Sequence, residues 1–305
     1  MTPPSSLVIT APAGRPRLRD EARELWRYRH LVRTLVERDL RSRYKNSVIG
    51  IGWTMINPLI QVLVLTVTIK YILNAGPENL SAYILCAQIP WTFFQTSVLD
   101  SSTSVLVKLG LLKKVYFPRE IPLIATVCQN FSQFLISLGV FVLYRWVLTP
   151  LIFGWPGPPT RELLWLPVIT AMLFLLTLGV AFIVATANVF YEDVKFIITI
   201  VMGFLSFLLP IIYFAENIYY SKHGSPRMRS WIYHLYLANP LAWIVNAFKQ
   251  MFFGRAVISN PGAPLLYSAP FDWRYLLICG ALSVAVFLYG YSFFNAHKWK
   301  FTERP

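Results

Sequence analysis

Charged residues are scarce in this sequence. They make up 14% of its 305 residues, whereas a soluble globular domain has about 25%. Hydrophobic residues make up 56%, and the mean hydropathy is +0.52. The apolar residues stand in blocks, several of which reach the roughly 20 residues that a helix needs to cross the hydrocarbon core of a bilayer. The composition therefore argues against an ordinary soluble domain and indicates a membrane protein.

Signatures of catalysis and of nucleotide binding are also missing. The sequence contains neither the phosphate-binding loop G-x-x-x-x-G-K-[ST] nor H-E-x-x-H, and its four histidines are scattered. Its three cysteines, Cys86, Cys128 and Cys279, lie inside apolar blocks without metal-ligand spacing, as small core residues do. The adjacent carboxylates Glu192 and Asp193 stand in a short loop, where a solvated turn is a better explanation than an acid–base pair. We therefore expect a chain that is not an enzyme and that binds no metal or other cofactor itself.

Six of the apolar blocks are long enough for a transmembrane helix. Three of them contain no Asp, Glu, Lys or Arg, and each of the others contains one. Their prolines and glycines are tolerated in a membrane bundle, where neighbouring helices satisfy the backbone groups that a kink leaves unpaired. The sequence thus predicts an all-α membrane protein with spans at about residues 49–73, 83–106, 121–144, 163–189, 196–215 and 273–294.

The net charge of +14 is distributed unevenly along the chain. Of the 28 Lys and Arg residues, 19 lie before residue 49, in the loop 107–120, at Lys195 or in the tail 297–305. With six spans and both termini inside, all of these positive charges face the cytoplasm, in agreement with the positive-inside rule. The charge therefore indicates topology and gives no support to a nucleic-acid partner.

The amino-terminal region changes character near residue 23. Residues 1–22 are rich in Pro and Arg and are expected to form a disordered basic extension. In residues 23–46, apolar side chains recur at spacings of three and four, and most arginines fall on the other sides. We expect an amphipathic interfacial helix on the cytoplasmic membrane face, where Trp26 and Tyr28 suit the headgroup level. The alternative is a solvated helix that merely leads into the first span.

The cytoplasmic loop of residues 107–122 reads VKLGLLKKVYFPREIP. Its centre is compatible with a short helix that the following proline would end. Such a helix, with Lys113, Lys114, Tyr116 and Phe117 exposed, is either an anchor that orients the chain or a docking element for a partner. The pattern alone leaves both possibilities open.

Residues 216–272, between the fifth and sixth spans, are predicted to lie outside. They contain two apolar runs, Trp231–Leu237 and Leu241–Phe253, each too short to span a bilayer. The pair Asn239-Pro240 separates them, because proline cannot continue the first helix but suits the first turn of the second. We expect a re-entrant helical hairpin that belongs to a gate or pathway. The alternative is an interfacial ectodomain.

Asp100 is the one ionisable residue well inside a predicted span. An intramembrane carboxylate is a candidate functional group. A polar helix end, or a pair with Lys108 two turns on, would explain Asp100 almost as well. Because no further acidic residue lies in the predicted spans, a proton-coupled transporter is disfavoured.

Aromatic residues make up 16% of the chain. Most aromatic residues of membrane proteins lie at the interface or face lipid. Clusters such as Trp91, Phe93 and Phe94 would also suit the apolar faces of sugar rings, and such a lining would let a polymer slide.

Five blocks of the sequence carry a resemblance to a known family. The first is ERDLRSRYKNSVIGIGWTMINP (37–58), followed by IPWTFF (89–94) and GLLKKVYFPREIP (110–122). NVFYEDVK (188–195) and ANPLAWIVNAFKQMFFG (238–254) complete the set. In content, order and spacing these blocks resemble the permease subunits of type-2 ABC exporters of O-antigen, teichoic acid and related polysaccharides. KKVYFPRE is the most specific motif, and the resemblance covers nearly all of the chain beyond its amino-terminal extension.

The resemblance implies a homodimer of six-span permeases (residues 47–296) in the bacterial inner membrane, bound to two copies of an ABC ATPase subunit. That partner would bind ATP and Mg and supply the hydrolysis, and the exported substrate would be a lipid-linked glycan. Predicted site residues fall into three groups: Lys113, Lys114, Tyr116, Phe117, Arg119 and Glu120 for coupling to the ATPase; Arg38, Arg41, Arg43 and Lys45 for lipid headgroups; and Trp91, Phe93, Phe94, Tyr219, Trp231 and Tyr233 for the translocation pathway.

Other functions are compatible with the same features. The chain could be an ABC permease for teichoic acid, for capsule, or for a small amphiphile or drug. A membrane scaffold or a glycan-assembly enzyme is a further alternative, although an enzyme is expected to bring polar residues together at a membrane face. A neighbouring gene for an ATPase with a Walker motif, set among glycosyltransferase genes, would favour the polysaccharide exporter.

Overall fold

The computed structural model describes residues 26–45, 50–72, 80–107, 118–148, 160–220, 225–254 and 270–302. Within these ranges all regular structure is helical and no strand occurs. The prediction of an all-α protein is therefore confirmed for the described part of the chain. The extension 1–22 lies outside it.

The described chain forms nine α-helices, and short π-helical or 3-10 segments extend several of them. Their bounds are α2 Arg29–Tyr44, α3 Trp53–Thr66 (continued by Val67–Ile72), α4 Leu80–Val107, α6 Ile121–Leu143 (continued by Tyr144–Leu148), α8 Leu166–Phe190 (preceded by Arg161–Trp165), α9 Val194–Leu208, α10 Pro226–Leu237, α11 Pro240–Phe253 and α12 Trp273–His297, with a final 3-10 turn, Lys298–Thr302.

Three helical segments of the described chain are, by length and composition, able to cross a membrane: Ile121–Val147, Arg161–Phe190 and Trp273–Phe301. They match the third, fourth and sixth predicted spans. The first and fifth correspond to shorter apolar helices, Pro58–Ile72 and Val194–Leu208. In place of the second, α4 has 28 residues, about 42 Å at 1.5 Å per residue, but its sequence mixes apolar with polar side chains. The count of six spans therefore stays a prediction.

The helix α9 ends earlier than the predicted fifth span, which reached residue 215. Leu209 is already extended, with φ −80° and ψ 151°. The residue before a proline avoids the helical region, because the proline ring clashes with its backbone. Pro210 therefore explains why α9 stops at Leu208.

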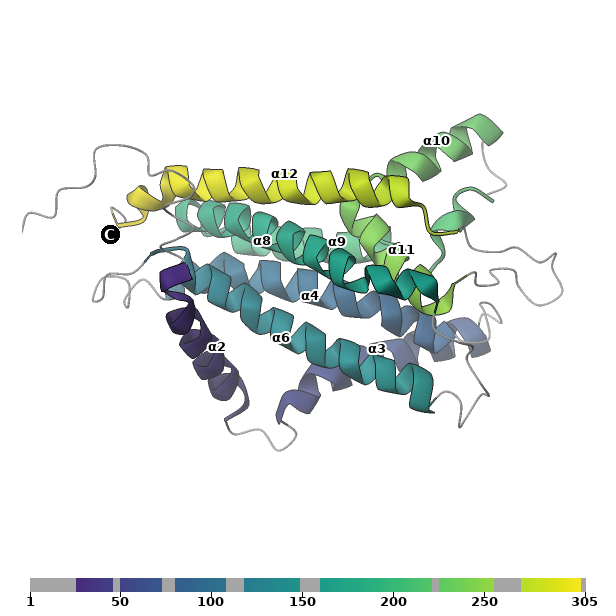
Figure 1. The fold of residues 1–305 in the computed structure, drawn as a ribbon, viewed down its shortest axis with the longest axis horizontal. Helices are drawn as coiled ribbons and strands as arrows, with labels where there is room; N and C mark the ends of the chain where they lie inside the picture. The colour runs from purple at the N-terminus through teal and green to yellow at the C-terminus, as the bar shows by residue number, and fades with distance from the viewer. Residues whose placement is uncertain are drawn as a thin grey trace, which may run out of the picture.

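The long helices α4, α6, α8 and α12 lie lengthwise beside one another (Figure 1). At one end, on the left in Figure 1, lie α2, the start of α6 and the end of α12. We call this the α2 end. The helices α10 and α11 lie toward the opposite end, which we call the α10 end. The helices α4, α8 and α12 run toward the α2 end, and α6 runs away from it.

The helices α8 and α12 pack with their backbones in contact. A Cβ atom at Gly290 would lie 2.2 Å from the carbonyl oxygen of Gly179. A Cβ atom at Gly179 would lie 2.7 Å from the backbone nitrogen of Phe287. Small residues allow this close approach, which is typical of helix pairs in membranes.

The helix α11 fills the core near the α10 end. All residues from Leu241 to Phe252 are buried, and α11 contacts α4, α8 and α12. The side chain of Asn239 accepts a hydrogen bond from the backbone nitrogen of Leu241 at 3.0 Å, and Pro240 occupies the first turn. The helix thus breaks where the sequence predicted. A re-entrant position in a membrane stays a prediction.

The amphipathic helix α2 lies against the first turns of α6. Leu35 is buried against Ile121 and Ala125, with Leu31 and Val32 packed beside them. The basic side chains lie mainly on the exposed sides of the helix. A helix is therefore present within residues 23–46 with its apolar face on the bundle, and its position at the membrane face stays a prediction.

Candidate functional site

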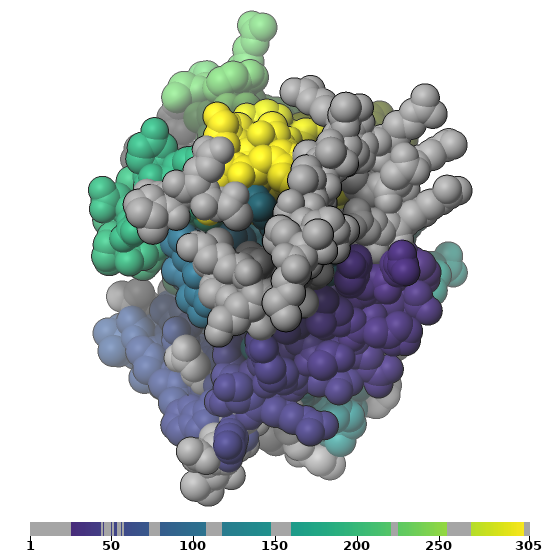
Figure 2. All heavy atoms as spheres, turned by 90° about the vertical axis from the view of Figure 1, so that its left-hand side faces the viewer, coloured from purple at the N-terminus to yellow at the C-terminus, as the bar shows by residue number. Residues whose placement is uncertain are grey.

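The α2 end carries the predicted coupling residues that the structure describes. Figure 2 looks at this end and has α2 and the end of α12 on the same face. Arg119 and Glu120 immediately precede α6 here. Lys113, Lys114, Tyr116 and Phe117 lie outside the described residues.

The two residues that immediately precede α6 contact the 3-10 turn Lys298–Thr302 that follows α12. The buried carboxylate of Glu120 accepts a bond from Nζ of Lys298 at 2.6 Å. Arg119 donates to the backbone carbonyl of Lys298, and its guanidinium carbon lies 5.5 Å from the ring centroid of Trp299. Of the two predicted coupling residues, Glu120 thus faces inward and Arg119 is half-buried.

Arg43 stands in a polar cluster that links α2, α4 and α6. Its Nη2 lies 2.9 Å from Oδ2 of Asp100, and its Nη1 lies 3.4 Å from the amide oxygens of Asn130 and Gln133. Asn130 Nδ2 donates to the same Asp100 oxygen at 3.1 Å. Two donors meet at one carboxylate oxygen of Asp100, and Asp100 therefore acts as a structural hydrogen-bond acceptor. Lys108, the alternative partner, lies outside the described residues.

The other predicted headgroup residues lie on the exposed sides of α2. Arg38 is 2.8 Å from Oδ1 of the neighbouring Asp39. Arg41 and Lys45 are exposed. Arg43 is engaged by the bundle, and a role of this group at lipid headgroups stays a prediction.

The predicted pathway residues of α4 are buried in the core. Trp91, Phe93 and Phe94 are at most 4% exposed. The ring centroid of Phe93 lies 5.3 Å from that of Phe134 on α6. Within one copy of the chain these three residues are packing residues, and a role in lining a pathway stays a prediction.

The other predicted pathway residues lie toward the α10 end. Tyr219 and Trp231 are exposed, and Tyr233 is buried with its ring centroid 6.0 Å from that of Tyr219. Burial, followed by the nearby charge of Glu216, raises the pKa of Tyr233. Its phenol is therefore neutral at physiological pH and acts as a hydrogen-bonding and packing group.

Lys249 is a candidate that sequence reasoning missed. It lies on α11 and is 1% exposed. Its Nζ donates to the carbonyls of Pro210 and Tyr213, the latter at 3.0 Å, and lies 4.2 Å from the ring centroid of Tyr83 on α4. A single lysine within the apolar run of α11 was the available signal. The ammonium group joins α11 to the segment that follows α9.

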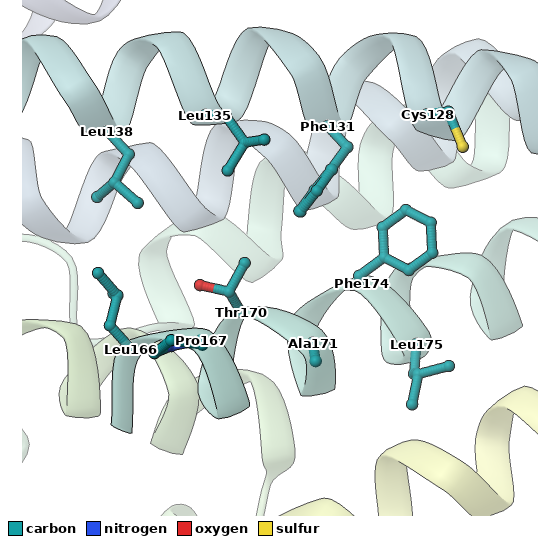
Figure 3. A pocket seen from close by; sticks show the side chains of 10 residues that line it. All are labelled: Cys128, Phe131, Leu135, Leu138, Leu166, Pro167, Thr170, Ala171, Phe174 and Leu175. Carbon is teal, nitrogen blue, oxygen red and sulfur yellow. The ribbon is translucent and has the colours of Figure 1, made fainter. Parts of the chain in front are cut away.

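An open apolar pocket of about 840 Å³ lies between α6 and α8 (Figure 3). Leu135 of α6 and Thr170 of α8 point into it. The rings of Phe131 and Phe174, with centroids 5.0 Å apart, lie toward one end. The lining suits hydrocarbon and offers no charge for a sugar phosphate.

A metal centre has no support in the described part of the chain. No group of three or more His, Cys, Asp or Glu side chains there is arranged to hold an ion.

The family resemblance is confirmed by comparison with known proteins. Residues 30–253 match the sequence profile described as ABC-2 type transporter. The O-antigen export system permease protein RfbA of Myxococcus xanthus is 26% identical over 282 residues, which cover 92% of this chain and 97% of that protein. The protein of the same name from Klebsiella pneumoniae is 24% identical over 274 residues, which cover 90% and 94%. Because the profile extends from α2 to the end of α11, most of the chain, the chain belongs to the ABC-2 type transporter family.

Proposed function

We propose that this chain is the transmembrane subunit of an ATP-driven exporter that moves a lipid-linked, O-antigen-like polysaccharide across the bacterial inner membrane. The observation that carries the proposal is its similarity to O-antigen export permeases over at least 90% of its length. The apolar long helices, the basic α2 end and the buried α11 agree with it.

In the proposed assembly, two copies of this six-span chain form the pathway and two ABC ATPase subunits bind the cytoplasmic side. The α2 end is the cytoplasmic side because it carries α2 and the end of α12, where the positive charge of the sequence is concentrated. ATP and Mg bind to the partner, which supplies the hydrolysis.

The substrate path is proposed to begin at the exposed cations of α2. Arg41 and Lys45 would attract the phosphate of a lipid carrier at the membrane surface. The glycan would leave between the two copies near the α10 end, past Tyr219 and Trp231. Both are exposed aromatic residues on the segment predicted as the gate.

The coupling proposal is tested by co-purification with an ABC ATPase encoded beside this chain. We expect wild-type chain to retain the ATPase, and the double substitution Tyr116→Ala with Phe117→Ala to reduce the retained amount by about tenfold. A tenfold weakening corresponds to about 1.4 kcal/mol, which is within the range that truncation of aromatic interface residues commonly costs. A matched control is Trp231→Ala, which removes an exposed aromatic side chain toward the opposite end of the bundle.

Undiminished binding by the double variant would remove residues 107–122 as the docking element. A wild-type chain that retains no ATPase would remove the exporter proposal itself. The purified chain alone is expected to hydrolyse no ATP. Transport of labelled glycan into inverted vesicles then separates a polysaccharide exporter from a permease for a small amphiphile.

A further inference from the structure

The final 3-10 turn, Lys298–Thr302, folds back onto the residues in front of α6. The Lys298–Glu120 ion pair is short, 2.6 Å, and both side chains are largely buried, at 13% and 4% exposure. The two residues are separated by 178 positions in the sequence. An ion pair with this burial constrains both segments, because neither charge can lose its partner without a large desolvation cost.

Arg119 gives the same two segments a second connection. It donates to the backbone carbonyl of Lys298, and its guanidinium lies over the ring of Trp299. The backbone contact depends on the position of the turn and is independent of the Lys298 side chain. Residues 119 and 120 are therefore held by the turn in two ways.

The turn is itself fixed to the bundle. Phe301 is 1% exposed, and its ring centroid lies 5.4 Å from that of Phe294 on α12 and 6.0 Å from that of Phe190 at the end of α8. These aromatic contacts fix the turn to two helices that pack backbone against backbone. A displacement of residues 119 and 120 must therefore move the turn or break the ion pair.

We propose that the turn Lys298–Thr302 holds the carboxyl-terminal end of the coupling loop (107–122) against α8 and α12, and that Glu120 is a positioning residue that acts through Lys298. The inference rests on the proposed function and deepens it. Movement of the loop by the ATPase then reaches α12 directly through this contact, in addition to α6 through the chain. Glu120 itself is buried and does not present its carboxylate to the ATPase.

The test uses the complex of the full chain with the ABC ATPase encoded beside it, reconstituted in lipid nanodiscs. Three variants are compared: Glu120→Lys, Lys298→Glu and the double exchange. ATP hydrolysis is measured per ATPase bound, with and without the permease, so that binding and coupling are read separately. We expect each single exchange to reduce permease-dependent stimulation at least about fivefold, because like charges then meet in a buried site. The double exchange is expected to restore most of it.

The matched control is the ion pair Arg33–Glu37 on α2, 2.9 Å long and exposed. Its single and double exchanges are expected to leave stimulation unchanged. If a charge reversal prevents folding, Lys298→Met is used instead, because it keeps the apolar part of the side chain. This variant is expected to reduce the stimulation of ATP hydrolysis while the chain still elutes as a folded complex. Full coupling in Lys298→Met, or no restoration by the double exchange, overturns the inference while leaving the exporter proposal intact. Failure of the wild-type chain to bind the ATPase overturns the exporter proposal instead.

Discussion

Single residues at the α2 end have partners that their sequence neighbours do not indicate. Asp100 accepts bonds from Arg43 and Asn130, which belong to α2 and α6. The side chains of Arg43 and Asp100 remain 41% and 35% exposed. Water therefore screens the pair, and its contribution to stability is modest. The cluster links the end of α2 to α4 and α6.

The substitution Asp100→Asn tests this role. Asparagine keeps the shape but removes the charge that Arg43 pairs with, and we expect a loss of about 1 kcal/mol at most. That loss corresponds to a fall of roughly 2 °C in melting temperature for a chain of this size. Thermal unfolding of the purified chain in nanodiscs measures it. Glu37→Gln, which removes the exposed pair within α2, is expected to change the melting temperature less.

If Asp100→Asn instead abolished transport while the melting temperature stayed unchanged, Asp100 would be a functional carboxylate. That outcome would contradict the structural assignment of Asp100.

At the scale of helices, the absence of a side chain at a glycine decides how closely two helices pack. The approach of α8 to α12 depends on two glycines, and any Cβ atom at Gly290 must displace the backbone of α8. By contrast, Gly203 on α9 has no atom within 4 Å of the place where a Cβ would lie. Gly290 and Gly203 have the same intrinsic helix propensity. The difference in the space around them therefore comes from how the helices pack.

Gly290→Ala and Gly203→Ala therefore form a matched pair. We expect Gly290→Ala to destabilise the chain by about 1–3 kcal/mol, as overpacked cores do. Gly203→Ala is expected to be neutral or to stabilise by up to about 1 kcal/mol, because alanine is the better helix former. Melting temperatures in the same nanodiscs measure both. Equal shifts would mean that α8 and α12 do not pack at this distance.

At the scale of the whole molecule, the two ends of the bundle differ in their charged and aromatic residues. The exposed cations of α2 and the buried Lys298–Glu120 ion pair lie at the α2 end, whereas Tyr219, Trp231 and the buried Lys249 lie toward the α10 end. This polarity is what a protein embedded across a membrane with a fixed orientation requires. It also places the proposed motor and the proposed exit for the glycan on opposite sides.

The orientation is tested with single cysteines at exposed positions near each end. Tyr191, in the turn between α8 and α9, is 72% exposed, and Met228 on α10 is 55% exposed. In spheroplasts, a membrane-impermeant maleimide is expected to label Met228→Cys and to label Tyr191→Cys only after permeabilisation. The native Cys86 and Cys279 are buried and Cys128 is half-buried, and a cysteine-free parent provides the background. The reverse pattern of labelling would contradict both termini being cytoplasmic.

The sequence predicted features that depend on composition and on local chain stiffness. Apolar blocks predicted the long helices, and Asn239-Pro240 predicted the break before α11. The predicted fifth span extends past the end of α9 because the apolar run continues beyond Leu208, whereas Pro210 keeps Leu209 out of the helical region. Among the site residues, the sequence singled out Asp100 as an ionisable group inside a predicted span and suggested Lys108 as its partner. Lys249 was not among the predicted site residues.

By itself, the sequence determined the all-helical class, the concentration of positive charge and the positions where helices end, because these follow from propensity, hydropathy and proline geometry near each residue. Only the tertiary structure decided that Arg43 pairs with Asp100, that Gly290 touches Gly179 and that Lys298 holds Glu120. These partners lie between 57 and 178 positions apart in the chain. Which distant residues meet depends on how the helices pack, and packing is a property of their faces taken together.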